Sequence, residues 1–296
     1  MSKFVISGFS DEICCDFEDQ LITVRELGMD HISIRGVGKK SICDLSLPEV
    51  GNYVKLMLDK YSVGVSSIGS PIGKISILEM RDPEKFRAHL ELAEHAAQIA
   101  NLLGSEYIRF FSFYIPEDVS PTECREEVLD SVRSVLEVFG RYGVTGLHEN
   151  ERNIYGDSLA RCLDIYENIR LPNLRAIFDF ANFVHCGEDP VECYKSLRPY
   201  ISYFHVKDAK VNSSDNVVCG TGDGKIAEIL RMASDDGFEG FLTLEPHLVP
   251  FHLLKSLELL PPEEVATNGG RFDGKAGFTL QHNALVEILL KLSYKN

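Results

Sequence analysis

Short runs of apolar and β-branched residues alternate with longer amphipathic stretches along most of the chain. After the run Phe4–Gly8, apolar residues recur at helical spacing at Phe17, Leu21, Val24 and Leu27. The same unit returns along the chain and predicts eight strands, at residues 4–8, 31–34, 63–68, 107–111, 144–148, 176–178, 201–206 and 241–244. A helix is predicted after each strand, at residues 16–27, 47–61, 82–103, 121–142, 158–168, 190–197, 225–234 and 280–291.

Strands that alternate with helices in this way form parallel sheets, and eight such units are typical of a closed (β/α)8 TIM barrel, an α/β fold. A Rossmann-like sheet with a second domain is the alternative. Its G-x-G-x-x-G fingerprint is missing after the first strand, where the chain reads Gly8-Phe9-Ser10-Asp11-Glu12. Because no Pro-, Gly- or Ser-rich linker divides the chain, we expect one domain over residues 1–296, with a loop insertion at residues 246–277 over the active face.

The composition narrows the classes of function. Hydrophobic residues make up 44% and charged residues 25%, which are ordinary values for a globular protein. A formal net charge of −15 argues against a nucleic-acid partner, because a phosphate backbone requires a basic surface. No apolar run approaches the roughly 18 residues of a membrane helix, and the N-terminus lacks the apolar length of a signal peptide. We therefore expect a cytoplasmic protein without a membrane partner, whose eight cysteines are free thiols.

The last four predicted strands each end on an acidic residue or a histidine within an apolar run. These residues are Glu149, Asp179, His205 and Glu245. In a TIM barrel the carboxyl ends of the strands carry the functional residues, so the four side chains are expected to meet at one end of the barrel. Single acids at strand ends often only cap the following helix, but a set from consecutive strands favours a shared cation. Three carboxylates and one imidazole suit one divalent ion, Mn²⁺ or Mg²⁺, with Co²⁺ or Zn²⁺ as alternatives.

Short motifs around these strand ends resemble the sugar phosphate isomerase/epimerase family with the xylose-isomerase-like TIM barrel. They read Leu147-His148-Glu149-Asn150-Glu151, Phe178-Asp179-Phe180-Ala181-Asn182-Phe183, Phe204-His205-Val206-Lys207-Asp208-Ala209 and Leu244-Glu245-Pro246-His247-Leu248. The similarity extends from the segment after the first strand, through Ser70-Pro71-Ile72-Gly73-Lys74, to the eighth strand. Each motif is short, but their order and spacing together indicate the superfamily. They do not indicate the substrate.

The resemblance implies a divalent metal held by the four residues and a small-molecule ketose or polyol substrate. A carbonyl and neighbouring hydroxyl chelated by the metal would favour an enediolate, formed when a carboxylate removes the adjacent proton. By resemblance Glu149 and Glu245 are this acid/base pair as well as metal ligands, and they can approach the substrate from different sides. This implies a metal-dependent sugar isomerase or epimerase. A homo-oligomer is compatible with the family, although no interface is evident in the sequence.

Two positions depart from the ketose 3-epimerases of this family. Where those enzymes have a histidine three residues after the metal aspartate and an arginine six after the metal histidine, this chain has Asn182 and Val211. A related dehydratase acting on an inosose-type keto-polyol begins with the same proton abstraction and is the main alternative. A non-catalytic sugar-binding barrel is an alternative of another class. An endonuclease of the abasic-site type is disfavoured by the acidic charge and by strand ends without further histidines.

Substrate-binding candidates lie close to the predicted metal ligands in the sequence or at other strand ends. They are Asn182, Lys207, His247, Arg109 and Lys74. For Lys207 the alternative is a solvent-exposed loop lysine, and for Arg109 an ion pair within an acidic protein.

Two further features have structural and functional interpretations. His148 precedes Glu149, and because side chains alternate along a strand it is expected to point toward the helix layer. The glycine-rich segment at residues 220–225 resembles a phosphate cradle, but its glycines are also what a tight loop before the next helix requires.

Overall fold

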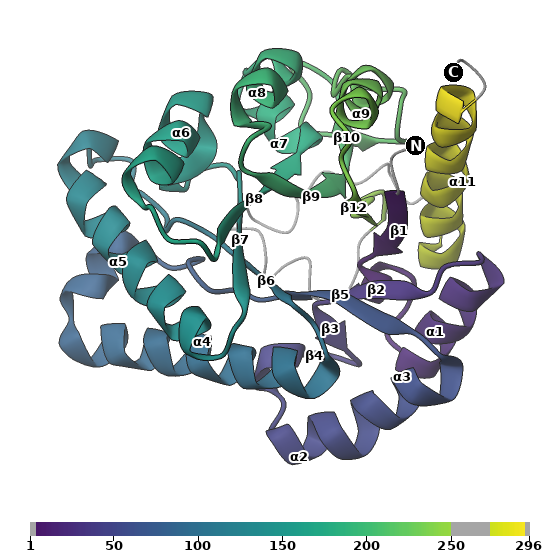
Figure 1. The fold of residues 1–296 in the computed structure, drawn as a ribbon, viewed down its shortest axis with the longest axis horizontal. Helices are drawn as coiled ribbons and strands as arrows, with labels where there is room; N and C mark the ends of the chain where they lie inside the picture. The colour runs from purple at the N-terminus through teal and green to yellow at the C-terminus, as the bar shows by residue number, and fades with distance from the viewer. Residues whose placement is uncertain (1–3, 250–272, 294–296) are drawn as a thin grey trace.

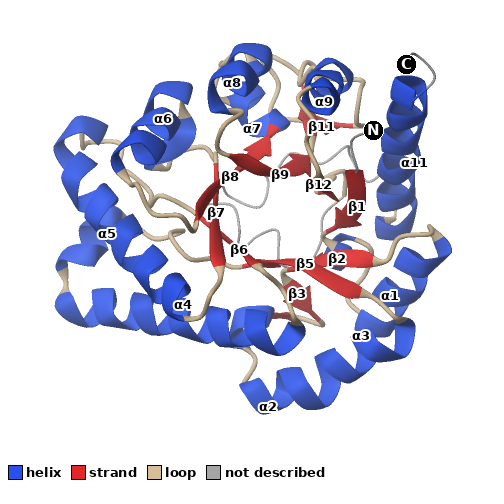
Figure 2. Ribbon diagram, in the orientation of Figure 1, coloured by secondary structure: helices blue, strands red, loops and turns tan. Residues whose placement is uncertain are grey.

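The computed structural model describes residues 4–249 and 273–293, and its parallel strands form a nearly closed barrel surrounded by helices (Figures 1 and 2). The eight strands are β1 (Phe4–Gly8), β2 (His31–Ile34), β5 (Gly64–Gly69), β6 (Tyr107–Phe110), β7 (Thr145–Glu149), β8 (Leu174–Asp179), β9 (Ile201–Val206) and β12 (Gly240–Leu244). They pair in the order β1-β12-β9-β8-β7-β6-β5-β2, and a parallel bridge between Phe9 and Ser33 brings the two edges together. The predicted (β/α)8 barrel is confirmed.

Helices follow the strands as the apolar spacing predicts. They are α1 (Phe17–Glu26), α2 (Leu47–Glu49) and α3 (Leu56–Tyr61) with a π-helical stretch between them (Val50–Lys55), α4 (Pro83–Leu103), α5 (Pro121–Arg141), α6 (Leu159–Asn168), α7 (Phe180–His185), α8 (Pro190–Leu197), α9 (Ile226–Asp235) and α11 (Gly274–Ser293). Their ends have local causes. Asp82 accepts hydrogen bonds from the first amides of α4, and Gly104 ends that helix at a positive φ of 72°.

Three details of the fold differ from the sequence prediction. Helix α7 begins directly after β8, and six residues are too few to show a helical period. Two small hairpins, β3–β4 (Gly36–Val37 and Lys40–Ser41) and β10–β11 (Asp208–Ala209 and Asn216–Val217), extend from the ends of β2 and β9. The expected insertion at 246–277 lies largely outside the described residues, and its last four residues belong instead to α11.

A polar layer fills the barrel beneath its carboxyl end. The buried Tyr203 hydroxyl lies 2.8 Å from Ser66 Oγ and 2.5 Å from Thr243 Oγ1, so strands on different sides of the barrel share one hydrogen-bonded group. Side chains therefore fill this part of the interior, and TIM barrels carry their functional residues at the carboxyl end of the strands.

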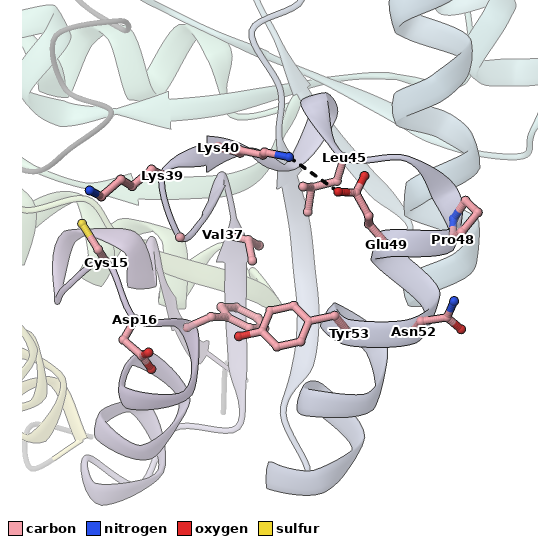
Figure 3. A pocket seen from close by; sticks show the side chains of 12 residues that line it. Cys15, Asp16, Val37, Lys39, Lys40, Leu45, Pro48, Glu49, Asn52 and Tyr53 are labelled. Carbon is pink, nitrogen blue, oxygen red and sulfur yellow. Dashed lines mark ion pairs between the residues drawn. The ribbon is translucent and has the colours of Figure 1, made fainter.

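A separate groove of about 720 Å³ lies outside the barrel, between the β3–β4 hairpin and the beginnings of α1 and α2 (Figure 3). Its walls include Phe17, Val37 and Tyr53, and the ion pair between Lys40 and Glu49 crosses it at 3.5 Å. None of the residues predicted to bind metal or substrate lines this groove.

Among the described helices, none combines the length and apolar character needed to span a membrane.

Candidate active site

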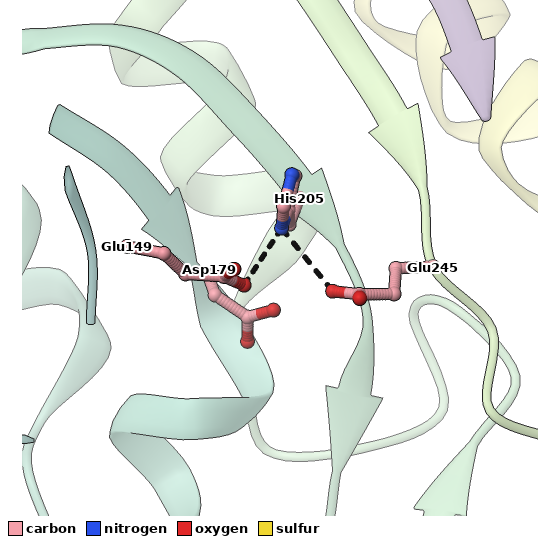
Figure 4. A group of neighbouring side chains, drawn as sticks. All are labelled: Glu149, Asp179, His205 and Glu245. Atoms are coloured by element: carbon pink, nitrogen blue, oxygen red, sulfur yellow. Dashed lines mark hydrogen bonds and ion pairs between the residues drawn. The ribbon is translucent and has the colours of Figure 1, made fainter. Parts of the chain in front are cut away.

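The four residues predicted to hold a metal meet at the carboxyl end of the barrel. Glu149, Asp179 and His205 lie on neighbouring strands β7, β8 and β9, and Glu245 directly follows β12 (Figure 4). His205 Nδ1 lies 2.7 Å from Glu149 Oε1 and 3.1 Å from Glu245 Oε2. Each side chain is at most 3% exposed. The strand order alone brings these residues together, since β9 is hydrogen-bonded between β8 and β12.

The chemistry of this group fits a divalent cation. One ligand atom from each of the four residues lies within 4.8 Å of all the others. Glu149 Oε2 and Asp179 Oδ2 are buried and accept no hydrogen bond within the described part of the chain. Because burying carboxylates costs free energy unless cations or donors compensate them, the arrangement favours a shared positive charge. The oxygen-rich donor set suits Mg²⁺ or Mn²⁺.

Burial and mutual charge shift the pKa values in the cluster in opposite directions. Burial raises the pKa of Asp179 to about 7, although the ammonium of Lys207 opposes the shift. Burial alone would lower the pKa of His205, but the carboxylates of Glu149 and Glu245 outweigh it and raise this pKa to about 9. Burial would raise the pKa of Glu245, yet Lys207 and His205 hold it well below its ordinary value. These shifts describe a strongly coupled set of charges.

Two predicted substrate-binding cations lie against the four residues. Lys207 Nζ is 3.1 Å from Asp179 Oδ2 and 3.4 Å from Glu245 Oε2, and the residue is 4% exposed. The alternative of a solvent-exposed lysine is therefore wrong. Arg109 Nη1 lies 3.5 Å from both Glu149 Oε2 and Glu245 Oε1. The alternative for Arg109, an ion pair, is thus also present, but it is made with the candidate ligands themselves.

Aromatic rings hold the cations of the barrel mouth in place. The Arg35 and Arg109 guanidinium carbons lie 4.4 and 5.0 Å from the centroid of the Phe9 ring. Phe111 similarly lies 4.9 Å from the Arg109 guanidinium and 4.6 Å from Lys74 Nζ. These cation–π contacts orient flexible side chains without occupying all their donors. Among the described residues, the buried Arg109 Nε donates no hydrogen bond.

The other substrate-binding candidates lie at the edge of the cluster. Lys74 forms an ion pair of 3.2 Å with Glu151 Oε2. His247 Nε2 lies 3.6 Å from Glu245 Oε1, in a residue with a φ of 46°. Asn182 Nδ2 donates to the Asn150 carbonyl at 2.8 Å, so this amide ties two strand ends together. The substrate-binding roles of all these residues remain predictions.

A buried group that was not predicted from the sequence supports Glu245. Arg35 donates to Asp11 Oδ2 at 2.9 Å, to Glu12 Oε1 at 3.2 Å and to Glu245 Oε1 at 3.1 Å. Glu12, Glu245 and His247 could themselves form a metal site, but the Arg35 guanidinium already lies between two of these carboxylates. The available signal was the segment Ser10-Asp11-Glu12, which places two acids directly after the first strand.

The glycine-rich segment that resembles a phosphate cradle holds a side chain of this protein. Asp208 accepts hydrogen bonds from the backbone amides of Gly220 (2.9 Å), Gly222 (2.9 Å), Gly224 (3.0 Å) and Ala209 (2.9 Å). The alternative interpretation of a tight structural loop is therefore correct. Val211, at the position of the family's arginine, is 56% exposed.

His148 points away from Glu149 toward the helix layer, as strand alternation predicts. Its ring nitrogens lie 3.1 Å from the Tyr166 hydroxyl on α6 and 3.0 Å from Ser112 Oγ. Burial lowers the pKa of His148 to about 3.

This depressed pKa predicts a loss of stability in acid. An unfolded histidine titrates near pH 6.5, so between about pH 6.5 and pH 3 the unfolded chain binds a proton that the folded chain does not. The contribution of His148 is complete above pH 6.5 and falls by up to about 1.4 kcal/mol per pH unit below it. In urea titrations at pH 7 and 5, His148→Gln is expected to lose less stability than the unsubstituted protein over this interval. Equal slopes for His148→Gln and the unsubstituted protein would contradict a buried neutral imidazole.

The barrel and its buried cluster of carboxylates and imidazole define a class of TIM-barrel proteins with a candidate divalent-metal site at the carboxyl end. The chain belongs to the xylose isomerase-like TIM barrel family, whose model matches residues 21–268. It is 28% identical over 130 residues to a 3-dehydroshikimate dehydratase from Bacillus anthracis, a match that spans 44% of this chain and 46% of that protein. The chain thus matches less than half the length of this curated relative.

Solved structures share the fold over nearly the whole chain. An L-ribulose 3-epimerase has a TM-score of 0.75 at 17% identity, with 100% of this chain and 97% of that one covered. A xylose isomerase-like TIM barrel protein from Mycobacterium smegmatis in complex with magnesium has a TM-score of 0.69 at 16% identity, with 99% and 98% covered. The similar proteins thus include a dehydratase and an epimerase, which differ in reaction, and a barrel protein solved with magnesium.

Proposed function

We propose that the chain is a metal-dependent sugar isomerase or epimerase that acts on a ketose or related polyhydroxy carbonyl compound by proton abstraction. The observation that carries the proposal is the placement of Glu149 and Glu245 on opposite sides of His205, at 2.7 and 3.1 Å from the same ring nitrogen (Figure 4). Two carboxylates that approach one position from different strands can remove a proton on one side and return it on the other. Glu149, Asp179, His205 and Glu245 would hold the metal.

The residues around the cluster each have a definite part in this proposal. When bound, a divalent ion supplies Lewis-acid polarisation of the carbonyl. Glu149 and Glu245 exchange the proton of the adjacent carbon. Lys207 and Arg109 donate to substrate oxygens that gain negative charge, and their burial strengthens this electrostatic contribution. Arg35 orients Glu245 through its contact of 3.1 Å.

Dehydration of a keto-polyol is the second candidate. It begins with the same proton removal, after which the carbon–oxygen bond at the neighbouring carbon breaks and the hydroxyl leaves as water. The similarity to a 3-dehydroshikimate dehydratase favours this candidate, as does Asn182 at the position of an epimerase histidine. The two reactions are distinguished by their products, since only dehydration yields a conjugated enone with strong ultraviolet absorbance. We would incubate the protein with ketoses and inososes in D₂O, follow carbon-bound deuterium by NMR as the report of proton exchange, and follow ultraviolet absorbance as the report of dehydration.

Metal content is the first test of the site. Protein purified without chelator is expected to contain about one divalent ion per chain, measured by inductively coupled plasma mass spectrometry. His205→Ala removes the only nitrogen ligand of the group and should reduce this content to a small fraction. The control is His31→Ala, because His31 lies at the start of β2, far from the carboxyl end of the barrel. Unsubstituted protein that takes up neither Mn²⁺ nor Mg²⁺ would contradict the proposed function and favour a binding protein.

A further inference from the structure

Lys207 lies against two of the four candidate metal ligands, Asp179 and Glu245. It follows the last residue of β9, two positions after His205, and strand alternation therefore directs both side chains toward the same side. The Lys207 amide also donates to the His205 carbonyl at 3.2 Å, which turns the chain at this point. The fold itself thus brings the ammonium among the carboxylates.

The ammonium bridges ligands from both neighbouring strands. Its contacts of 3.1 Å to Asp179 and 3.4 Å to Glu245 reach the β8 side and the β12 side of β9. His205 makes a similar bridge between Glu149 and Glu245. Through these two bridges, each of the three carboxylates among the candidate ligands has a positively charged or hydrogen-bonding neighbour from β9 or from the residue that follows it.

A divalent ion would use the same carboxylate lone pairs as this ammonium. Asp179 Oδ2 accepts no hydrogen bond from the described residues and has Lys207 Nζ as its near cation. If a divalent ion binds the four residues, Lys207 must give up at least part of this interaction and then repels the ion at short range. Buried charges interact strongly at such distances because little solvent separates them.

We propose that Lys207 is the resident counter-ion of the metal site: it neutralises Asp179 and Glu245 while no divalent ion is bound, and it weakens binding of the ion by direct competition. This inference rests on the proposed function, because it concerns the same four ligands. It assigns Lys207 a positioning role in addition to the predicted contact with substrate. Exchange of one cation for another would also release the ammonium toward the substrate.

The test measures Mn²⁺ binding by calorimetry with metal-free full-length protein, without any substrate. Lys207→Met keeps most of the side-chain length but removes the charge, so the Kd for Mn²⁺ is expected to fall about tenfold or more. The metal-free variant should also melt several degrees below the unsubstituted protein, since its buried carboxylates have lost a partner. Added Mn²⁺ should therefore raise the melting temperature of the variant more than that of the unsubstituted protein.

Lys74→Met is the matched control, because Lys74 is also a largely buried lysine of the barrel mouth but pairs with Glu151 outside the four ligands. Its Kd for Mn²⁺ should stay within about threefold of the original, as expected for a more distant charge. Lys207→Arg restores the charge and should return the affinity toward the original value. Should Lys207→Met fail to fold, Lys207→Gln provides the neutral variant.

The outcomes separate the two proposals. If unsubstituted protein binds Mn²⁺ and neutral variants at Lys207 bind it equally or more weakly, the counter-ion role is wrong while the metal-dependent function stands. If only the neutral variants bind Mn²⁺, Lys207 is confirmed as the competing cation and the proposed metal-dependent function fails. If none of these proteins binds Mn²⁺, both proposals are wrong.

Discussion

Replacing Glu149 with glutamine is expected to slow incorporation of solvent deuterium into a ketose substrate by about 10²–10⁴-fold, the contribution typical of a general base. Glutamine has nearly the same shape but cannot accept the proton. Glu245→Gln should cause a loss of similar size, because each carboxylate serves one side of the substrate. The measurement is the rate of carbon-bound deuterium appearance by NMR, at a Mn²⁺ concentration that saturates each variant.

The matched control for this experiment is Glu151→Gln. Glu151 lies two residues after Glu149 and pairs with Lys74 at 3.2 Å instead of contacting the four ligands. Its partner Lys74 is a substrate-binding candidate at the edge of the site, so we expect a change mainly in KM for this variant. A fully loaded Glu149→Gln protein that exchanges deuterium at the original rate would contradict the assignment of Glu149 as a base. Loss of metal without loss of rate in the loaded state would restrict Glu149 to ligand binding.

The fold and the four central residues were predictable because local rules determine them. Short apolar and β-branched runs mark the eight strands, and a period of about 3.6 residues marks the longer helices. Parallel connections then place every strand's carboxyl end at the same end of the barrel. The acids and histidine at the ends of β7, β8, β9 and β12 therefore had to meet, whatever the details of packing.

The supporting residues were not predictable in the same way. Arg35 contacts Asp11 and Glu245, which lie 24 and 210 positions away in the sequence. No local period encodes such contacts, since they depend on side-chain length and on the closure of the barrel between β1 and β2. The burial of Lys207 was similarly undetermined, because a lysine just after a strand is compatible with either a solvated loop or a buried ion pair.

The loop at residues 220–225 shows how one motif can support two structures. Closely spaced glycines leave backbone amides accessible to any anion, whether a phosphate or a carboxylate from the protein. Here Asp208 supplies the anion, and a side chain at Gly222 would come within 2.3 Å of Asp208 Oδ1. The sequence contained both the glycines and the aspartate, but only the structure shows that they are partners.

Asp208→Asn is accordingly expected to cause the largest loss of stability at the barrel's carboxyl end. Gly220 and Gly222 donate to one carboxylate oxygen and Gly224 and Ala209 to the other. An asparagine has one accepting oxygen, so in either orientation two backbone amides would face its NH₂ group: the buried pair of Gly224 and Ala209, or the partly buried pair of Gly220 and Gly222. At about 1–3 kcal/mol for each unsatisfied donor, the expected cost is about 2–6 kcal/mol. This corresponds to a fall in Tm of roughly 5–15 °C, measured by calorimetry.

The control for this variant is Asp223→Asn in the same loop, where a single amide, that of Val211, donates to the carboxylate at 2.9 Å. Its loss should stay below about 1.5 kcal/mol, because one accepting oxygen remains sufficient. If Asp208→Asn has the same Tm as the unsubstituted protein, the loop amides have other partners and the Asp208 carboxylate does not stabilise the loop. Because Asp208 already satisfies these amides, a phosphorylated substrate would have to place its phosphate elsewhere. Inorganic phosphate is therefore expected not to bind these amides, and its addition should leave the Tm of the unsubstituted protein unchanged.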